Sequence, residues 1–234
     1  MTPRRTGEIE YVLVRSHGRR TADIVVERDG SVQVRIPDFL PEEAADKLIE
    51  RKRLWIYRSL AEWRDLNATR VLREFRNGEG FLYLGSSYRL SLVSNQKQPL
   101  LLADGRFRLR RSLAERGTAA ARGAFRDFYT EKGRVRLERR SAHFAGKVGV
   151  QITGIKITDL GYRWASCTLS GTLRFHWRCM MAPAKIIDYI VVHELCHLRH
   201  RDHTYAFWNE VDKVMPDYAE RKTWLQRNGA GLDV

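Results

Sequence analysis

The chain of 234 residues lacks the features of several protein classes. No stretch approaches the roughly 18 to 20 consecutive apolar residues that a membrane-spanning helix needs. Its first residues, MTPRRTGEIEYVLVRS, have no apolar run of signal-peptide length behind their basic residues. We find no internal repeat and no low-complexity tract in the sequence. These absences predict a globular protein that stays in the cytoplasm and has no contact with the membrane.

Cysteine is scarce, and its placement excludes a disulfide framework. The chain has three cysteines, Cys167, Cys179 and Cys196, which is an odd number and includes no C-x-x-C pair. Small disulfide-stapled domains and cysteine-based zinc modules need more cysteines, in regular spacings. We therefore expect all three to be buried side chains that behave as small apolar groups.

Acidic residues are outnumbered by basic ones. The chain has 28 Asp and Glu against 42 Lys and Arg, which gives a formal net charge of +14 and a pI near 10.1. Such a balance favours polyanionic partners such as nucleic acid, through neutralisation of phosphates. The basic residues are scattered along the chain, however, and most sit beside apolar residues at strand or helix spacing. A solvated basic surface explains many of them, so charge alone leaves nucleic-acid binding open.

The pattern of apolar residues predicts a β-rich first half with one long helix. Alternating apolar residues indicate strands over 8–37, where Asp29-Gly30 joins two alternating runs as a hairpin turn. A helix is expected from about 41 to 65, and further strands over 81–93 and 99–111.

The second half changes character near residue 117 and is mainly helical. We expect a helix over 118–144, a strand over 148–160 and a hairpin that turns at Ser170-Gly171, followed by three helices, at 183–199, 203–215 and 217–228. The expected fold class is α+β, with a β-rich region over 1–116 and a second domain over 117–234. This boundary is soft, because the two halves can share one core.

The most informative segment is His193-Glu194-Leu195-Cys196-His197, an H-E-x-x-H motif. Two histidines four residues apart project from one face of a helix, so both imidazoles can reach one metal ion. The surrounding helix is apolar on nearly every side and is therefore expected to be buried, where unpartnered polar side chains are costly. The motif predicts zinc held by His193 and His197, with Glu194 as the general base that activates a zinc-bound water.

A catalytic zinc needs a third protein ligand. His200 follows on the same helical stripe, but an unbroken helix would rise about 10.5 Å from His193 to His200, too far for one ion. If the helix ends near Arg199, the chain can turn back and present His203. Glu210, on the following helix, is the alternative. Helix geometry favours His203 as the third ligand and leaves Glu210 as the alternative.

Three further elements accompany H-E-x-x-H: Trp164-x-Ser166-Cys167, Ala182-Pro183, and the His203, Phe207, Trp208 block. With these motifs, residues 160–229 resemble the YgjP-like bacterial metallopeptidases, relatives of the WLM and SprT-like zincins. This resemblance implies a zincin-like metallopeptidase domain behind a β-rich leader, and His203 as the third zinc ligand. His200 stands where metzincins carry a glycine, so the turn must be made differently. We also assign Met215 no methionine-turn role.

The resemblance implies a zinc metallopeptidase that hydrolyses protein or peptide substrates. Relatives include proteases that act on DNA-bound or crosslinked proteins, which extends the expectation to DNA-associated substrates. The hairpin over 162–176 would offer an edge strand to an extended substrate. The residue that stabilises the oxyanion is not identifiable, with Tyr205, Tyr218, Arg174 and His176 as candidates.

The alternative from another class is a nucleic-acid-associated protein with a structural zinc site and little or no proteolysis. Glu194 separates the two hypotheses, because a structural site needs no carboxylate beside its first ligand.

Overall fold

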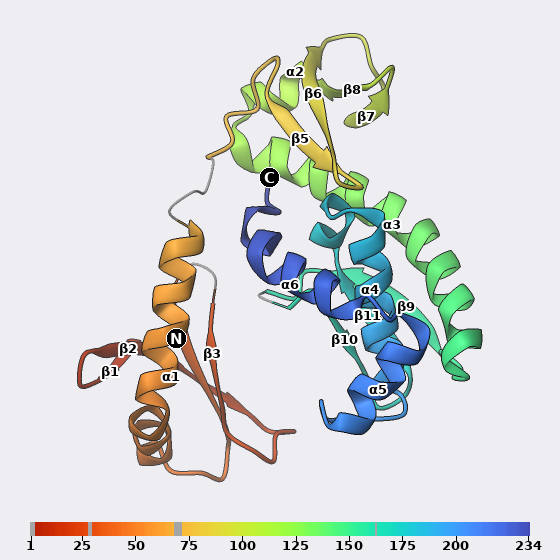
Figure 1. Cartoon of the computed structure of the whole chain (residues 1–234). Coiled ribbons are helices and arrows are strands. Elements are labelled where there is room, and N and C mark those ends of the chain that lie inside the picture. The colour runs from red at the N-terminus through yellow and green to blue at the C-terminus, as the bar shows by residue number, and fades with distance from the viewer. Residues whose placement is uncertain (1–2, 28–29, 68–71, 162) are drawn as a thin grey trace. The chain divides into compact units, whose positions relative to one another are not determined.

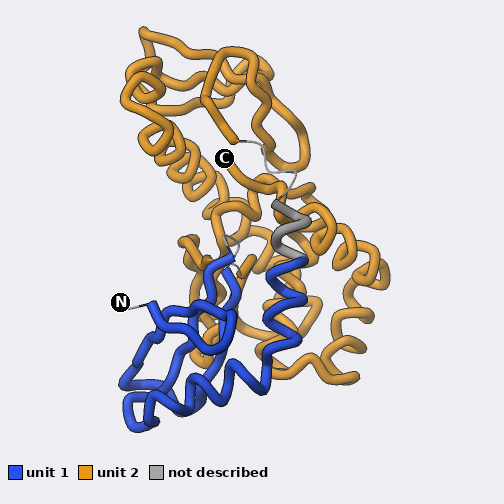
Figure 2. The backbone as a smooth tube through the Cα atoms, turned by 90° about the vertical axis from the view of Figure 1, so that its left-hand side faces the viewer, with its two compact units in different colours: residues 1–70 blue, residues 71–234 orange. Residues whose placement is uncertain are grey.

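The structure, a computed structural model, describes residues 3–27, 30–67, 72–161 and 163–234. The chain forms two compact units, residues 1–70 and 71–234, shown in different colours in Figure 2. The first unit thus ends well before the soft boundary expected near residue 116. In the part of the chain that the structure describes, no helix has the length and apolar character needed to span a membrane.

Unit 1 is a small sheet with one helix packed against it (Figure 1). Its sheet has the order β1-β2-β4-β3, in which β2 and β4 run parallel and the other neighbours antiparallel. The antiparallel pairing of β3 with β4 confirms the expected hairpin, although Asp29 of its turn lies outside the described residues. The elements are β1 (Pro3–Thr6), β2 (Ile9–Ser16), β3 (Asp23–Val26), β4 (Val32–Pro37) and α1 (Glu43–Asn67).

The core of unit 1 lies between the sheet and α1. Val34 and Ile36 on β4 and Ile49 and Ile56 on α1 are at most 1% exposed and belong to one apolar cluster. Asp46 on α1 accepts hydrogen bonds from the side chains of residues on two strands, Thr6 and Tyr11. The helix is therefore fixed to the sheet by apolar packing and by the half-buried carboxylate of Asp46.

Unit 2 begins with a second sheet, of order β5-β6-β8-β7, that packs on a long helix. Its elements are β5 (Gly80–Tyr83), β6 (Ser86–Val93), β7 (Leu100–Ala103), β8 (Arg106–Arg110), α2 (Arg111–Glu115) and α3 (Thr118–Val148). Phe81 and Phe107 of the sheet contact Phe125 of α3, with ring centroids 4.4 and 5.1 Å apart. Because these strands share their core with α3, the chain does not divide at residue 116.

The remainder of unit 2 is a smaller sheet covered by helices (Figure 1). The sheet order is β10-β11-β9, which leaves β10 at an edge, and β10 and β11 form the expected hairpin. The elements are β9 (Gly154–Thr158), β10 (Ala165–Cys167), β11 (Thr172–His176), the 3₁₀ turn η1 (Trp177–Met181), α4 (Ala184–Cys196), α5 (Tyr205–Val214), α6 (Tyr218–Asn228) and η2 (Gly229–Gly231).

A two-residue turn connects the first sheet of unit 2 to η1, close to the start of α4. Leu84 and Gly85, between β5 and β6, both have positive φ, at 51° and 85°. Their backbone N–H groups donate to the carbonyls of Met180 and Met181 in η1, at 2.9 and 3.1 Å. The hairpin is therefore anchored at Met181, two residues before Pro183, the N-cap of α4.

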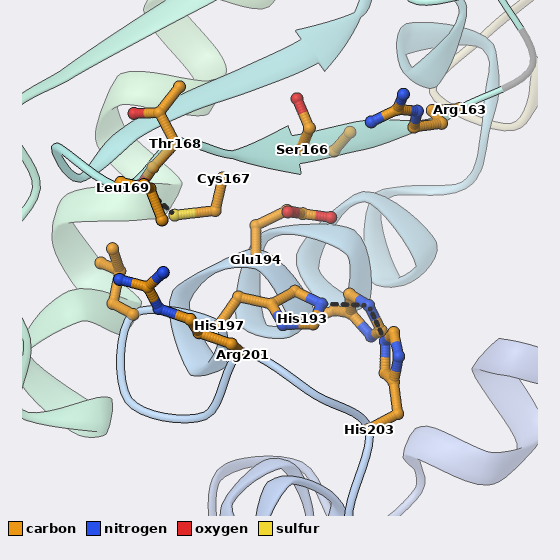
Figure 3. Close-up of a pocket in the computed structure, with 12 residues that line it drawn as sticks. Arg163, Ser166, Cys167, Thr168, Leu169, His193, Glu194, His197, Arg201 and His203 are labelled. Atoms are coloured by element: carbon orange, nitrogen blue, oxygen red, sulfur yellow. Dashed lines mark hydrogen bonds between the residues drawn. The ribbon is translucent and has the colours of Figure 1, made fainter. Parts of the chain in front are cut away.

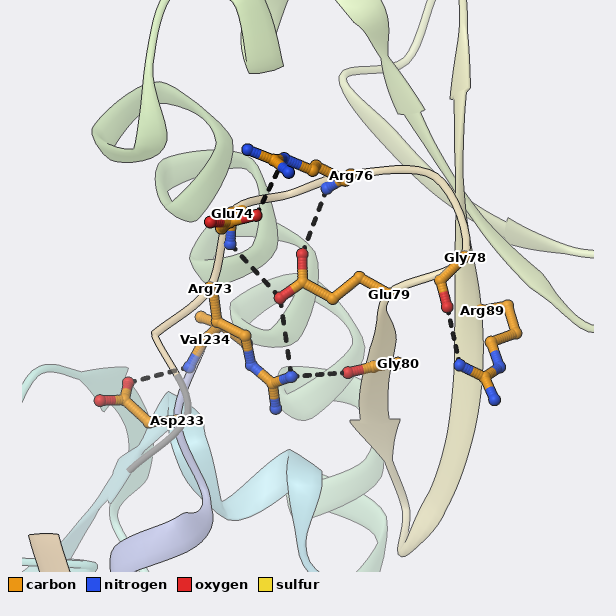
Figure 4. Close-up of polar contacts among 9 residues, drawn as sticks. All are labelled: Arg73, Glu74, Arg76, Gly78, Glu79, Gly80, Arg89, Asp233 and Val234. Carbon is orange, nitrogen blue, oxygen red and sulfur yellow. Dashed lines mark hydrogen bonds and ion pairs between the residues drawn. The ribbon is translucent and has the colours of Figure 1, made fainter. Parts of the chain in front are cut away.

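The segment that leads into β5 is fastened to the same sheet (Figure 4). The Glu79 carboxylate accepts from the backbone N–H groups of Glu74 and Arg76, at 3.4 and 3.2 Å. Arg73 donates to the Gly80 carbonyl at 3.0 Å. These contacts explain why residues from 72 onward belong to unit 2.

Candidate metal centre

Helix α4 carries the H-E-x-x-H motif through the middle of unit 2. Most of its residues are buried, as its all-round apolar sequence predicts. The helix ends at Cys196, with His197 as its C-cap. Glu194 is only 6% exposed, so its carboxyl lies inside the protein. The chain can leave the helix axis directly after His197, as an approach by a third ligand requires.

Three histidines converge next to this helix end (Figure 3). Nε2 of His193 lies 3.2 Å from Nε2 of His197 and 3.0 Å from Nε2 of His203. A tetrahedral ion with Zn–N bonds of about 2.0 to 2.1 Å would hold two ligand nitrogens about 3.3 Å apart. The spacing of the three imidazoles is therefore close to what such an ion needs.

The ring of His197 is fixed in the tautomer that a metal requires. Its Nδ1 lies 3.1 Å from the backbone carbonyl of His200. A carbonyl oxygen only accepts, so Nδ1 carries the proton and Nε2 keeps its lone pair toward the cluster. The turn where metzincins place a glycine is thus held by the backbone of His200. The side chain of His200 is not part of the histidine cluster.

Two aromatic residues of α5 support the imidazoles. Phe207 is fully buried, and its ring centroid lies 5.0, 4.6 and 4.7 Å from those of His193, His197 and His203. Trp208 stacks on His203 at 5.5 Å with an interplanar angle of 25°. His203 is exposed, and stacking on Trp208 restricts its ring in addition to the contact with Phe207.

Burial shifts the protonation of the site. Burial lowers the pKa of His193 to about 3, and the neighbouring His197 and His203 act in the same direction. The ring is therefore neutral at pH 7, as a metal ligand must be. Burial also raises the pKa of Glu194 to about 8, opposed by the charge of Arg163. A cation bound beside Glu194 would favour its ionised form and so lower that pKa.

An open cleft of about 440 Å³ gives access to the histidines and Glu194. One wall comes from the segment through β10, including Ala165 and Ser166, and the other from α4 and the turn after it. Arg163 and Arg201 also line the cleft and lie on opposite sides of it in Figure 3. The cleft therefore brings together a carboxyl, three imidazoles, two guanidinium groups and the segment of an edge strand.

Other residues considered from the sequence lie elsewhere. Glu210 is buried and forms ion pairs with Arg199 and Lys213, at 3.1 and 3.3 Å. It is not among the grouped metal-ligating side chains.

The four candidates for stabilising an oxyanion, Tyr205, Tyr218, Arg174 and His176, do not line the cleft. Tyr205 is 88% exposed, and His176 is buried and pairs with Asp159 at 3.3 Å.

The structure corrects one expectation and adds two residues. Cys179 and Cys196 are buried as expected, but Cys167 is only half-buried and lines the cleft, so the prediction for that cysteine was wrong. Arg163 and Arg201 were not singled out from the sequence, where they are two of many arginines. Only the fold distinguishes them, by placing both beside Glu194 and the histidines.

Two comparisons with known proteins found a match. A family model described as "YgjP-like, metallopeptidase domain" matches residues 20–228. The chain is also similar to the crystal structure of the metallopeptidase zymogen of Pyrococcus abyssi abylysin. The two are 27% identical, and the match covers 37% of this chain and 89% of that chain with a TM-score of 0.35. No curated protein matches the chain significantly.

Proposed function

Since this chain belongs to the YgjP-like metallopeptidase family, we propose that His193, His197 and His203 are its metal ligands and that the metal is zinc. Three neutral imidazoles suit zinc as well as some other transition metals. An adjacent Glu in an H-E-x-x-H helix is the arrangement of zinc peptidases. The observation that carries the proposal is the convergence of three Nε2 atoms beside an open cleft.

The proposed reaction is hydrolysis of a peptide bond, with Glu194 as the general base. Zinc bound at the three histidines would polarise the scissile carbonyl and lower the pKa of water in the cleft. Glu194 takes the proton of the attacking water and passes it to the leaving amine. Its burial supports this role, because a carboxylate shielded from bulk solvent is a stronger base.

We propose that the substrate binds in extended form along β10. This strand lies at the edge of its sheet, and Ala165, Ser166 and Cys167 all line the cleft. An edge strand has backbone N–H and C=O groups that can pair with an extended peptide, which would then run past Glu194. Protein or peptide segments without stable structure are the substrates that fit this arrangement.

The test combines metal analysis with a Glu194→Gln variant. We expect the variant to retain about one zinc per chain and to lose cleavage of an unfolded protein by about 10²- to 10⁴-fold. Glu138→Gln, on the exposed side of α3, is the matched control and should cleave at the wild-type rate. Equal cleavage by wild type and Glu194→Gln would refute the general base. A zinc-loaded wild type without proteolysis would favour the structural-zinc alternative.

The finer proposal on substrates is that the enzyme acts on proteins associated with nucleic acid in the cytoplasm. The support is the distribution of charge. Residues 71–234 contain 28 Arg and Lys against 16 Asp and Glu, whereas residues 1–70 contain 14 against 12. The excess positive charge thus belongs to the unit that carries the cleft. Three free cysteines fit the reducing conditions of the cytoplasm.

A further inference from the structure

The sheet β5-β6-β8-β7 has one apolar face and one basic face. Along β8, Phe107 and Leu109 are fully buried toward α3. Side chains alternate between the two faces of a strand, so Arg106, Arg108 and Arg110 share the opposite, outer face. The same alternation directs Leu90 on β6 inward and Arg89 outward.

The register of the strands gathers these arginines. In the parallel pairing of β6 with β8, Arg89 lies opposite Arg106, and the next outward pairs are Ser91 with Arg108 and Val93 with Arg110. The four arginines therefore lie on two adjacent strands. We call them, Arg89, Arg106, Arg108 and Arg110, the arginine face.

Little of this charge is neutralised within the protein. Asp104 pairs with Arg108 at 2.5 Å. Arg89 donates to the carbonyl of Gly78 at 2.8 Å, which orients its guanidinium without cancelling the charge (Figure 4). Among the residues that the structure describes, neither Arg106 nor Arg110 has an ion-pair partner. Residues 86–116 as a whole contain seven Arg and Lys against two Asp and Glu.

The pairing of Arg89 with Arg106 works against the stability of the sheet. These like charges lie directly opposite each other on neighbouring strands, which is destabilising. Serine or threonine at these outward positions would keep the face soluble without the repulsion. Arginines at such positions are explained if an anionic partner binds across them.

We propose that the arginine face binds the phosphate backbone of nucleic acid. A guanidinium forms paired hydrogen bonds to phosphate oxygens, which a lysine ammonium cannot do. Alternate residues along β8 are about 6.6 Å apart, so successive arginines can contact separate phosphates of one strand.

The composition of the face favours nucleic acid over a lipid surface. Stable membrane binding usually combines basic residues with large apolar side chains that insert among the lipids. Among the described residues of unit 2, the large exposed apolar side chains are Leu72, Val135, Leu169 and Tyr205, and all lie outside the arginine face and its strands. No exposed aromatic ring lies among the four arginines to stack on bases, so binding should depend on phosphate contacts alone and not on sequence.

This inference deepens the proposed function, because it names the surface through which the enzyme would reach substrates on nucleic acid. The inference about nucleic-acid binding and the proposed peptidase function can fail separately. Binding to the arginine face is measured without proteolysis, and proteolysis of an unfolded protein is measured without nucleic acid.

The experiment measures binding of the zinc-loaded full chain to a fluorescent duplex DNA of about 20 base pairs by anisotropy, between about 50 and 200 mM salt. Four phosphate contacts predict a slope of log Kobs against log salt of about −3.6. The variant Arg106→Gln/Arg110→Gln removes two contacts without breaking an ion pair, and its slope should be about −1.8. The control Arg134→Gln/Arg139→Gln removes the same charge from exposed positions on α3 and should keep the wild-type slope.

Three outcomes would overturn the proposal. The first is no binding of wild type to the duplex at about 50 mM salt. The second is an equal loss in both double variants, which would mean that net charge and not this surface is responsible. The third is arginine-dependent binding to vesicles of phosphatidylcholine and phosphatidylserine by a protein that does not bind the duplex. In the expected case the Arg106→Gln/Arg110→Gln variant still cleaves an unfolded protein at the wild-type rate.

Discussion

Shortening Phe207 should loosen the metal centre more than it weakens the fold. Its fully buried ring contacts all three imidazoles, with centroids within 5.0 Å. The imidazoles are thus held from one side by a single rigid group. Replacing that ring with a smaller, flexible side chain lets each imidazole move away from the common point on which the three nitrogens converge.

The size of both effects follows from burial. Phe207→Ala would leave a cavity and cost about 3 to 5 kcal/mol of unfolding free energy, a large share of the 5 to 15 kcal/mol available to a domain. Phe207→Leu removes much less volume than Phe207→Ala and should cost about 1 kcal/mol, so this variant remains folded. Groups that orient metal-binding histidines typically contribute about 10- to 100-fold to metal affinity. We expect Phe207→Leu to bind zinc about tenfold more weakly.

The assay is zinc competition against a chromogenic chelator, with urea unfolding of the metal-free protein beside it. Phe125→Leu is the matched control, because Phe125 is also fully buried in the same cluster but its ring contacts are with other aromatic residues of the sheet and α3. Both variants should lose similar stability, and only Phe207→Leu should lose zinc affinity. Equal zinc affinity in the two variants would refute the role of Phe207 as a support for the imidazoles.

Two further predictions concern how the elements are held. Gly85→Ala should destabilise unit 2 by about 2 to 3 kcal/mol in urea, because φ is +85° and a Cβ would lie 2.9 Å from Cα of Pro183. Gly105→Ala, with φ of +70° and open space around it, should cost only about 1 kcal/mol, and equal losses would contradict the contact with Pro183. Asp46→Asn should cost about 1 kcal/mol at pH 7, because hydrogen bonds from Thr6 and Tyr11 lower the pKa of Asp46 and so stabilise its ionised form. That stabilisation is present above the ordinary carboxyl pKa of about 3.9 and is lost as pH falls through the lowered pKa of the folded protein. Urea unfolding should therefore give wild type and Asp46→Asn the same unfolding free energy in acid. A difference between them that persists there would contradict the reasoning.

Much of the metal centre follows from local sequence. The apolar run around His193 predicts a buried helix, and four-residue spacing places His193 and His197 on one side of it. The sequence narrows the third ligand only to two candidates, one imidazole and one carboxylate. Whether His203 or Glu210 reaches the cluster depends on how the chain turns after α4, and that turn is held by a backbone carbonyl, which every residue carries. In the structure, Glu210 forms ion pairs with Arg199 and Lys213 and is not grouped with the three histidines.

Long-range packing accounts for what the sequence did not indicate. The soft boundary near residue 116 followed a change from strand to helix pattern, but aromatic side chains on β5 and β8 pack on α3 across it. The arginine face depends on the parallel register of β6 and β8, which are separated by β7 in the chain. An alternating strand reveals that its arginines share a face. It does not reveal which other strand lies beside it.

Helix α3 gives the two sheets of unit 2 a common core. Near its start it packs against β5 and β8, and near its end Arg140 forms two hydrogen bonds, of 2.7 and 2.8 Å, to Asp188 of α4. Buried residues along its whole length belong to the one apolar cluster that contains both sheets, so opening of either sheet removes contacts from the same helix. We therefore expect backbone amides of α3 and α4 to exchange with deuterium only when the whole unit opens. Any ligand that stabilises the arginine-bearing sheet would then slow exchange around the histidines as well.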